Sequence, residues 1–315
     1  MLVHGSVFET IAGNACVKVS IPIFAPCCEQ QLEFNIKWHY VANKITAEEK
    51  TFNYHVDSFK EIYTEKLQRD VEMEVLLPPK SFLDSGDLPL LLLNDGQDNE
   101  AVKIKATLER LLSNELIEPM IVVGVKAGDR MQEYGVSARK DYQGRGSKAQ
   151  AYSAFVVEEL MPYLLYKYPI AREAKRHAIA GYSLGGLSAV DIAWHHPNLF
   201  SKVGVFSGSF WWRKRDTASR FYSDHYLIRK GKRKSGLKFW FQTGTKDEAS
   251  DRNKNGIIDS IDDTLDLIVE LTKKGYRPFH DISYLEVKDG EHNFKTWSKV
   301  MPAFLQWAFP ASKNT

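Results

Sequence analysis

The stretch that decides the fold is AIAGYSLGGLSAV (178–190), in which residues 181–185 read Gly-x-Ser-x-Gly. A continuous apolar run before the serine and small residues after it are typical of a buried strand that turns sharply into a helix. In such a turn the serine has a strained backbone, and side chains two positions to either side would collide, which explains the glycines. The pattern predicts that Ser183 is a nucleophile. The alternative is a tight turn needed only for packing, in which Ser183 caps the helix.

Other short apolar runs lie on both sides of this turn along the chain. Runs of this kind bounded by Gly, Pro or Asp are typical of strands buried on both faces. Helical patterns lie between them, most clearly over residues 148–168. Strands and helices in alternation predict an α/β protein with a mostly parallel central sheet and helices on both faces. The predicted strands are 88–95, 120–125, 177–182, 203–208, 237–244 and 281–287.

The N-terminal part of the chain has a different pattern. Apolar residues alternate with polar or small ones over 17–23, 32–38 and 52–56. This period of two indicates half-buried antiparallel strands. We therefore expect residues 1–57 to form a β-rich N-terminal extension without visible chemistry. Residues 58–315 are expected to form the α/β domain, which opens with another alternating run at 71–77.

Composition excludes several classes of protein. With 43% hydrophobic and 26% charged residues, the 315-residue chain is globular and not disordered. Its 42 basic and 40 acidic side chains do not indicate a nucleic-acid-binding protein. No apolar run is long enough to span a membrane, and no signal peptide is recognisable. We expect a cytoplasmic protein, or a periplasmic or secreted one if the N-terminus is incomplete. The oligomeric state is left open.

A serine nucleophile needs a base that is held by an acid, and in this architecture both follow the serine in chain order, each after a strand. His292 follows strand 281–287, and no other histidine fits this position as well. The alternative is that His292 is a loop histidine without a catalytic role. Asp247 and Glu248 follow strand 237–244, and we prefer Asp247 because it comes first off the strand. The predicted triad is Ser183, Asp247 and His292.

Attack on a carbonyl group also requires two backbone N–H groups that stabilise the oxyanion. One is expected from Leu184, directly after the nucleophile. The other is expected from the loop 94–97, where Gly96 lets the backbone turn inward and Gln97 supplies the N–H group. The alternative for this loop is an ordinary Asp-Gly turn.

The chain resembles the Putative esterase family of α/β-hydrolases, which includes enterochelin, feruloyl and acetyl-xylan esterases, S-formylglutathione hydrolase and mycolyltransferases. The resemblance covers residues 58–309 and implies an α/β-hydrolase fold. It also implies a serine hydrolase with an acid after the seventh strand and a histidine after the eighth, which match Asp247 and His292. Members differ widely in acyl acceptor and leaving group, so no substrate follows. The matching segments are LLLLNDGQDN (90–99), DYQGRGSKAQAYSAFVVEELMPYL (141–164), GYSLGG (181–186), FSGSFWW (206–212), TGTKDE (243–248) and GEHNFKTW (290–297).

Residues 251–262, DRNKNGIIDSID, resemble an EF-hand calcium loop. Calcium prefers six to eight oxygen ligands on a flexible frame, and this spacing wraps oxygens around one point. The loop departs from the pattern because Asp262 replaces the bidentate glutamate and a strand, not a helix, precedes it. A bound ion would brace the loop that carries Asp247. The alternative is a loop that folds without metal. The candidate ligands are Asp251, Asn253, Asn255, Ile257, Asp259 and Asp262.

Four further residues follow strand ends and are candidates for substrate binding. Trp211 and Trp212 could form an aromatic platform for a sugar or phenolic leaving group, or could pack in the core under a lid. Arg130 and Tyr134 could orient a polar substrate, the alternative being a salt bridge or a surface loop.

Together these features predict a serine carboxylester hydrolase that works through an acyl-enzyme without an organic cofactor. The expected partner is a small-molecule or carbohydrate-linked ester, such as a carbohydrate, phenolic or siderophore ester, and neither nucleic acid nor membrane. Two alternatives stay open: an acyltransferase that passes the acyl group to a sugar alcohol, and a non-catalytic carbohydrate-binding protein of the same fold.

Overall fold

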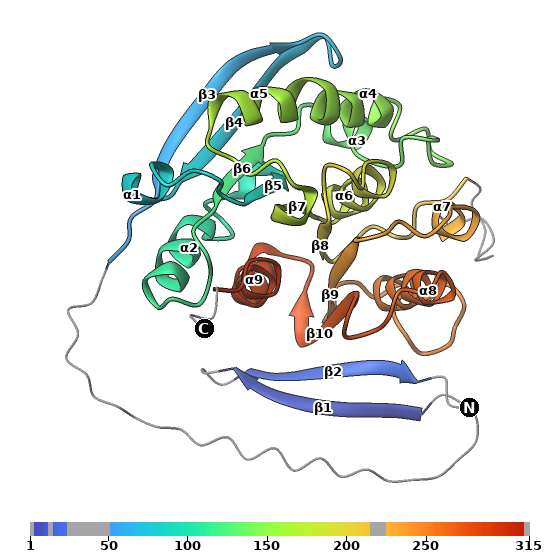
Figure 1. The fold of residues 1–315 in the computed structure, drawn as a ribbon. Helices are drawn as coiled ribbons and strands as arrows, with labels where there is room; N and C mark the ends of the chain where they lie inside the picture. The colour runs from blue at the N-terminus through green and yellow to red at the C-terminus, as the bar shows by residue number, and fades with distance from the viewer. Residues whose placement is uncertain (1–2, 12–14, 24–50, 215–224, 312–315) are drawn as a thin grey trace, which may run out of the picture.

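The computed structural model describes residues 3–11, 15–23, 51–214 and 225–311 (Figure 1). No helix in these ranges is both long and apolar enough to cross a membrane. The strands are β1 (Val3–Ile11), β2 (Ala15–Ile23), β3 (His55–Thr64), β4 (Arg69–Leu77), β5 (Leu90–Asn94), β6 (Ile121–Val125), β7 (His177–Tyr182), β8 (Lys202–Phe206), β9 (Lys238–Lys246) and β10 (Ile282–Glu291). The helices are α1 (Lys80–Leu83), α2 (Ile104–Ser113), α3 (Arg130–Glu133), α4 (Ala149–Ala154), α5 (Met161–Lys167), α6 (Leu184–His195), α7 (His225–Lys230), α8 (Asp259–Lys273) and α9 (Phe294–Ala308), with 3-10 turns at Gly96–Asp98 and Ala174–Arg176 and a π-helical turn at Phe155–Leu160.

The strands form one sheet in the order β1-β2-β10-β9-β8-β7-β5-β6-β4-β3. Strands β10, β9, β8, β7, β5 and β6 are parallel to one another, and these are the six strands that the apolar runs predicted. β4 pairs antiparallel with β6, and β3 pairs antiparallel with β4. The prediction of a mostly parallel central sheet is confirmed.

The N-terminal extension is described only in part. β1 and β2 pair as an antiparallel hairpin next to β10, which agrees with the alternation over 17–23. The run 32–38 lies outside the described residues. β3 belongs to the main sheet and begins at His55, so the expected boundary after residue 57 falls inside a strand. The division of the chain into two domains stays a prediction.

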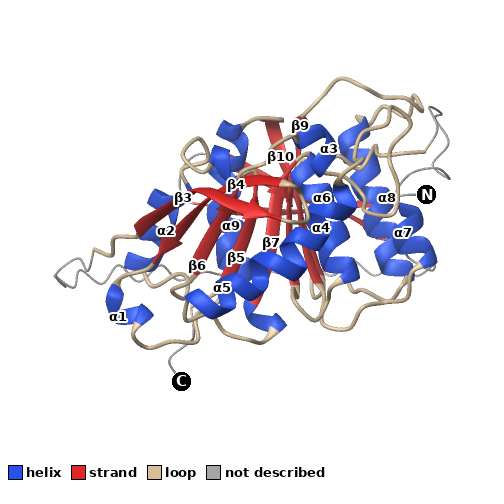
Figure 2. Cartoon of the chain, turned by 90° about the horizontal axis from the view of Figure 1, so that it is seen from above, coloured by secondary structure: helices blue, strands red, loops and turns tan. Residues whose placement is uncertain are grey.

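Helices cover both faces of the sheet because each central strand is apolar on both sides. In β5, Leu90 and Leu92 join one core cluster with residues of α4, α6 and α8, whereas Leu91 and Leu93 join a second cluster with residues of α2 and α9. Figure 1 shows α4, α5 and α6 on one side of the sheet and α2 and α9 on the other, and Figure 2 views the sheet from the side that α4, α5 and α6 cover. Burying such a side chain fully contributes about 1.5–3 kcal/mol.

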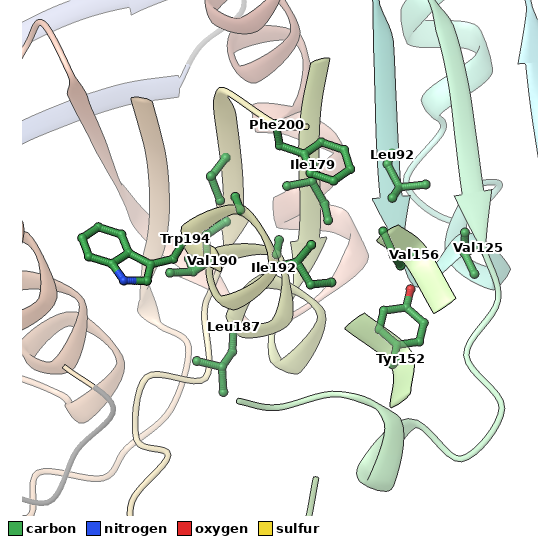
Figure 3. Close-up of a cluster of buried hydrophobic side chains, with 14 of the residues drawn as sticks. Leu92, Val125, Tyr152, Val156, Ile179, Leu187, Val190, Ile192, Trp194 and Phe200 are labelled. Carbon is green, nitrogen blue, oxygen red and sulfur yellow. The ribbon is translucent and has the colours of Figure 1, made fainter. Parts of the chain in front are cut away.

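Helix α6 is the central element of the larger core cluster. Figure 3 shows Val190 and Ile192 of α6 beside Ile179 of β7, with Leu92 of β5 and Tyr152 of α4 on the neighbouring strand and helix. All but one of the residues of α6 are buried, so this helix is apolar around most of its circumference. The turn at Ser183, where this helix starts, is therefore fixed to the centre of the sheet.

The single helix predicted over 148–168 is instead α4, a π-helical turn and α5. Pro162 lies in the first turn of α5. A proline inside a regular α-helix lacks one N–H donor and clashes with the carbonyl four residues before it. The wider turn at 155–160 moves that carbonyl away, so the helix continues with a local change of pitch.

Candidate active site

Ser183 lies between β7 and α6 in a backbone conformation that few non-glycine residues adopt, with φ 54° and ψ −118°. The two flanking glycines are required by close packing. A Cβ atom on Gly181 would lie 2.4 Å from the carbonyl carbon of Gly185, and one on Gly185 would lie 2.5 Å from Oδ2 of Asp95. The strand-turn-helix geometry predicted for the pentapeptide is therefore present.

The loop after β8 holds the serine in place. The N–H group of Ser183 donates to the carbonyl of Phe206 at 2.9 Å, and its carbonyl accepts the N–H of Ser209 at 3.2 Å. The hydroxyl oxygens of Ser183 and Ser209 are 3.0 Å apart. Sequence reasoning assigned no role to Ser209, although it lies in the segment FSGSFWW after a predicted strand.

Asp247 and His292 are placed side by side by the pairing of β9 and β10. Lys246 at the end of β9 pairs with Glu291 at the end of β10, and each of the two candidates is the next residue. β10 carries an irregularity between Val287 and Glu291, where the register shifts. Because the strands are parallel, both side chains leave the sheet at the same edge as Ser183.

The carboxylate of Asp247 is half-buried and only partly satisfied. Its Oδ2 accepts the N–H of Gly244 at 2.9 Å, while Oδ1 is buried and accepts no hydrogen bond from the described residues. Burial raises the pKa of Asp247 to about 6, and contacts with the Gly244 N–H and the Ser207 hydroxyl act in the opposite direction. Glu248, the other candidate acid, interacts instead with the backbone of Ser260 at the start of α8.

His292 is exposed to solvent. Desolvation of its imidazole by the surrounding protein lowers the pKa of His292, and the positive charge of Arg130 lowers it further. Its ring meets Trp297 edge-to-face at a centroid distance of 5.2 Å. In the described part of the chain, no hydrogen bond joins His292 to Ser183 or Asp247. In enzymes without bound substrate, catalytic hydrogen bonds are often long and shorten only in the complex.

The loop after β5 packs directly on the nucleophile turn. The side-chain amide of Asn94 donates to the carbonyl of Gly185 at 2.7 Å. Asp95 has a left-handed backbone (φ 64°), and a Cβ on Gly96 would lie 2.3 Å from the backbone of the neighbouring strand β6. Gln97 and Leu184 are each among the first residues of a helical turn, so their N–H groups have no acceptor within that turn.

Arg130 joins this loop to the nucleophile turn. Its Nε and Nη2 donate to the two carboxylate oxygens of Asp95 at 2.7 and 3.0 Å, and Nη2 also donates to the carbonyl of Tyr182 at 3.0 Å. The hydroxyl of Tyr134 accepts the N–H of Asp95 at 2.8 Å. Asp95 and Tyr134 are both 0% exposed. Arg130 thus forms the salt bridge named as its alternative, and Tyr134 is buried with its hydroxyl bonded to backbone. A role of either residue toward a substrate stays a prediction.

The two tryptophans differ in their surroundings. Trp212 is fully buried, and a Cβ on Gly135 or Gly146 would lie within 2.8 Å of its ring. This burial favours core packing over contact with a substrate. Trp211 is half-buried, and the guanidinium of Arg145 lies 4.4 Å from the centre of its ring.

The predicted calcium loop is closed by its own hydrogen bonds. The side chains of Asp251, Asn253 and Asn255 accept backbone N–H groups of residues 255–257, including that of Ile257, at 2.8–3.1 Å. These contacts are the Asx turns that Asp and Asn form in tight loops. The same side-chain oxygens of Asp251, Asn253 and Asn255 have further lone pairs that a metal ion could use.

The remaining carboxylates of the loop have protein partners. Arg252 pairs with Asp259 at 3.2 Å and with Asp263, and the amide of Asn253 donates to Asp262 at 2.6 Å. Across the described ranges, no group of three or more His, Cys, Asp or Glu side chains is arranged to hold a metal ion. The donor set therefore fits calcium only if Arg252 releases Asp259.

Comparison with known proteins matches residues 64–308 to the model of the family described as Putative esterase. An uncharacterized protein, YbbA of Bacillus subtilis strain 168, is 22% identical over 244 residues, which cover 76% of this chain and 92% of that protein. Iron(III) enterobactin esterase of Escherichia coli strain K12 is 42% identical over 60 residues, which cover 19% of this chain and 15% of that protein.

Solved structures show the same fold. A ferulic acid esterase superposes with a TM-score of 0.63 at 18% identity, covering 82% of this chain and 98% of that one. The enterobactin esterase from Shigella flexneri, crystallised in the presence of enterobactin, superposes with a TM-score of 0.62 at 21% identity, covering 81% of this chain and 58% of that one. The α/β-hydrolase fold expected from the sequence is confirmed.

The ion pair between Arg130 and Asp95 leads to a prediction about stability. Arg130→Gln leaves the fully buried Asp95 without its charge partner, and breaking a buried pair in this way costs about 3–5 kcal/mol. The double variant Arg130→Gln/Asp95→Asn recovers most of this loss because no buried charge remains. Urea unfolding measures both effects.

The control is Lys80→Gln, since Lys80 pairs with Asp84 at the surface, with side chains 84% and 61% exposed. Its free energy of unfolding should change by less than about 1 kcal/mol. An Arg130→Gln variant as stable as this control would contradict the structural role given to Arg130.

Proposed function

Because the chain belongs to the Putative esterase family and is therefore a carboxylic ester hydrolase, we propose that Ser183, His292 and Asp247 carry out the cleavage through an acyl-enzyme. The observation that carries this proposal is the strained Ser183 backbone between two glycines that have no room for a Cβ atom. Strain of about 1–3 kcal/mol persists only where the surrounding structure enforces it, and it concentrates at functional sites.

In the proposed reaction, His292 takes the hydroxyl proton of Ser183 while the oxygen attacks the ester carbonyl carbon. The N–H groups of Gln97 and Leu184 stabilise the oxyanion. The tetrahedral intermediate collapses, the ester bond breaks, and His292 returns the proton to the leaving alcohol. A water molecule, deprotonated by His292, then releases the acid from Ser183. Asp247 orients the imidazole and stabilises its charged form.

We further propose that the substrate is an ester with an aromatic acyl or alcohol group. Phe294 follows His292 by two residues, is 39% exposed, and contacts the ring of Trp297, which also contacts His292. Trp211 is half-buried in the loop after β8, which also carries Ser209. Two structural relatives are named for ferulic acid and for enterobactin, and one was crystallised with 2,3-dihydroxy-N-benzoyl-glycine. Aromatic rings on both substrate and protein favour stacking contacts.

The nucleophile is tested by hydrolysis of p-nitrophenyl acetate and methyl ferulate. Ser183→Ala should lower kcat more than about 10³-fold, because the other catalytic groups cannot act without the nucleophile. Ser209→Ala is the matched control, since its hydroxyl is 3.0 Å from that of Ser183. It removes a single hydrogen bond and should cost no more than about tenfold.

The same assay separates the alternatives. Equal activity of folded wild-type protein and Ser183→Ala would reject the serine mechanism and favour the non-catalytic binding protein. Product analysis with an added sugar alcohol distinguishes hydrolysis from acyl transfer. Release of free acid as the main product supports the hydrolase, whereas an acylated sugar as the main product supports the acyltransferase.

The pKa shifts predict how activity depends on pH. The reaction needs His292 neutral and Asp247 ionised, so both groups must have lost a proton. The pKa of His292 lies below its ordinary value, and that of Asp247 is about 6. For an uncharged ester, kcat/KM should therefore be at its plateau above pH 7 and fall steeply as the pH drops through about 6. Circular dichroism at each pH checks that the fold is intact. A flat profile down to pH 5 would contradict this assignment.

A structural calcium ion in the 251–262 loop also remains a proposal. The side-chain oxygens of Asp251, Asn253 and Asn255 support it, while Arg252 competes for Asp259. After chelator treatment, calcium at about a hundred times its dissociation constant should raise the Tm by about 5 °C. Arg252→Gln should enlarge this shift by freeing Asp259. An unchanged Tm in both proteins would show that the loop folds without metal.

A further inference from the structure

Trp297 lies in the first turn of α9, five residues after His292, and is 5% exposed. The start of this helix is fixed by a cap, in which the side chain of Asn293 accepts the N–H of Thr296 at 3.0 Å. His292 therefore directly precedes a capped helix end, and the position of the indole relative to the imidazole is defined by a short, ordered segment.

The indole of Trp297 contacts both the residue that precedes Ser183 and the imidazole of His292. Its ring stacks on Tyr182 with centroids 4.9 Å apart and planes inclined by 22°. Tyr182 is the residue directly before Ser183. The imidazole of His292 meets the indole edge-to-face at 5.2 Å, with planes inclined by 76°. Offset-stacked and edge-to-face pairs are the preferred arrangements of aromatic rings, so both contacts are favourable.

The polar end of the indole is joined through Ser207 to β9, the strand that leads to Asp247. Nε1–H of Trp297 donates to the hydroxyl oxygen of Ser207 at 3.0 Å, and both groups are buried. Ser207 has a left-handed backbone (φ 48°), and its N–H donates to the carbonyl of Gln242 at 2.8 Å. An indole can only donate a hydrogen bond, so the proton of the Ser207 hydroxyl stays available for an acceptor. The Ser207 hydroxyl also acts to lower the pKa of Asp247, against the effect of burial.

We propose that Trp297 is a positioning residue that fixes the base and the acid relative to the nucleophile, through its ring contacts with His292 and Tyr182 and its hydrogen bond to Ser207. The inference rests on the proposed function, because it assumes that these three elements act together. Trp297 touches no substrate atom in this role. Its effect is on kcat, since a small misplacement of reacting groups can cost about a hundredfold in rate while ground-state binding is retained.

The test compares kcat and KM for p-nitrophenyl acetate, together with the rate at which a fluorophosphonate labels Ser183. Trp297→Phe keeps one aromatic ring but removes the Nε1–H donor and the second ring of the indole, so kcat should fall about fivefold. Trp297→Leu removes the ring contacts as well, and kcat should fall about 10²-fold with KM within twofold. Ser207→Ala combined with Trp297→Phe should be no slower than the slower single variant, because both remove the same hydrogen bond.

Trp240 provides a matched control for lost packing. It is 4% exposed, belongs to the same core cluster, and its ring contacts those of Phe206 and Phe304, not those of His292 or Tyr182. Trp240→Phe and Trp240→Leu should lower the Tm but keep kcat within twofold. If Trp297→Leu keeps kcat within threefold of wild type, or loses no more than Trp240→Leu, Trp297 is only a core residue and the inference is wrong.

Trp297→Phe settles the question if Trp297→Leu does not fold, because the ring that packs in the core is retained. Additive losses for Trp297→Phe and Ser207→Ala would also overturn the link through Ser207. Failure of the proposed function has a different signature. In that case wild-type protein neither hydrolyses the ester nor reacts with the fluorophosphonate at Ser183, and both proposals fall together.

Discussion

The site depends on how closely α6 approaches the strand that precedes it. The carbonyl of Gly185 lies where a Cβ atom of Gly181 would be, so the chain can reverse within the few residues around Ser183. The serine is forced into a positive φ, at a cost of about 1–3 kcal/mol. Burial of nearly the whole of α6 in the core offsets this cost, because the helix cannot move away from the sheet without exposing apolar surface.

A non-glycine residue with positive φ also follows other strands of the sheet. Three strands that are neighbours in the sheet, β5, β7 and β8, are each followed directly by a non-glycine residue with positive φ: Asp95, Ser183 and Ser207. Each of these residues makes the chain leave its strand sharply at the carboxyl edge. Each is held by bonds from other segments, as in the ion pair from Arg130 to Asp95. Strain and its restraints are thus concentrated at one edge, while the centre of the sheet is regular.

Helices and strands that are marked by a regular spacing of apolar residues could be predicted from the sequence. Contacts between residues far apart in the chain could not. The six parallel strands and the turn at Ser183 follow from apolar runs and glycine spacing, which are local signals. The roles of Trp297 and Ser207 are not local, because their hydrogen bond joins residues 90 positions apart. The burial of Tyr134 was missed for the same reason. Its place after a strand end does not show that a backbone N–H from another loop binds its hydroxyl inside the protein.

Because of the irregularity in β10, the position of His292 relative to the sheet does not follow directly from that of Asp247. Between the pairs Val287–Gly244 and Glu291–Lys246, β10 advances by four residues while β9 advances by two. β10 therefore has two extra residues in a local bulge. The position of His292 beyond the end of the sheet depends on that bulge and not on the length of the strand. The position and direction of the His292 side chain can therefore change through substitutions within a few residues of β10, while the sheet and Asp247 keep their positions.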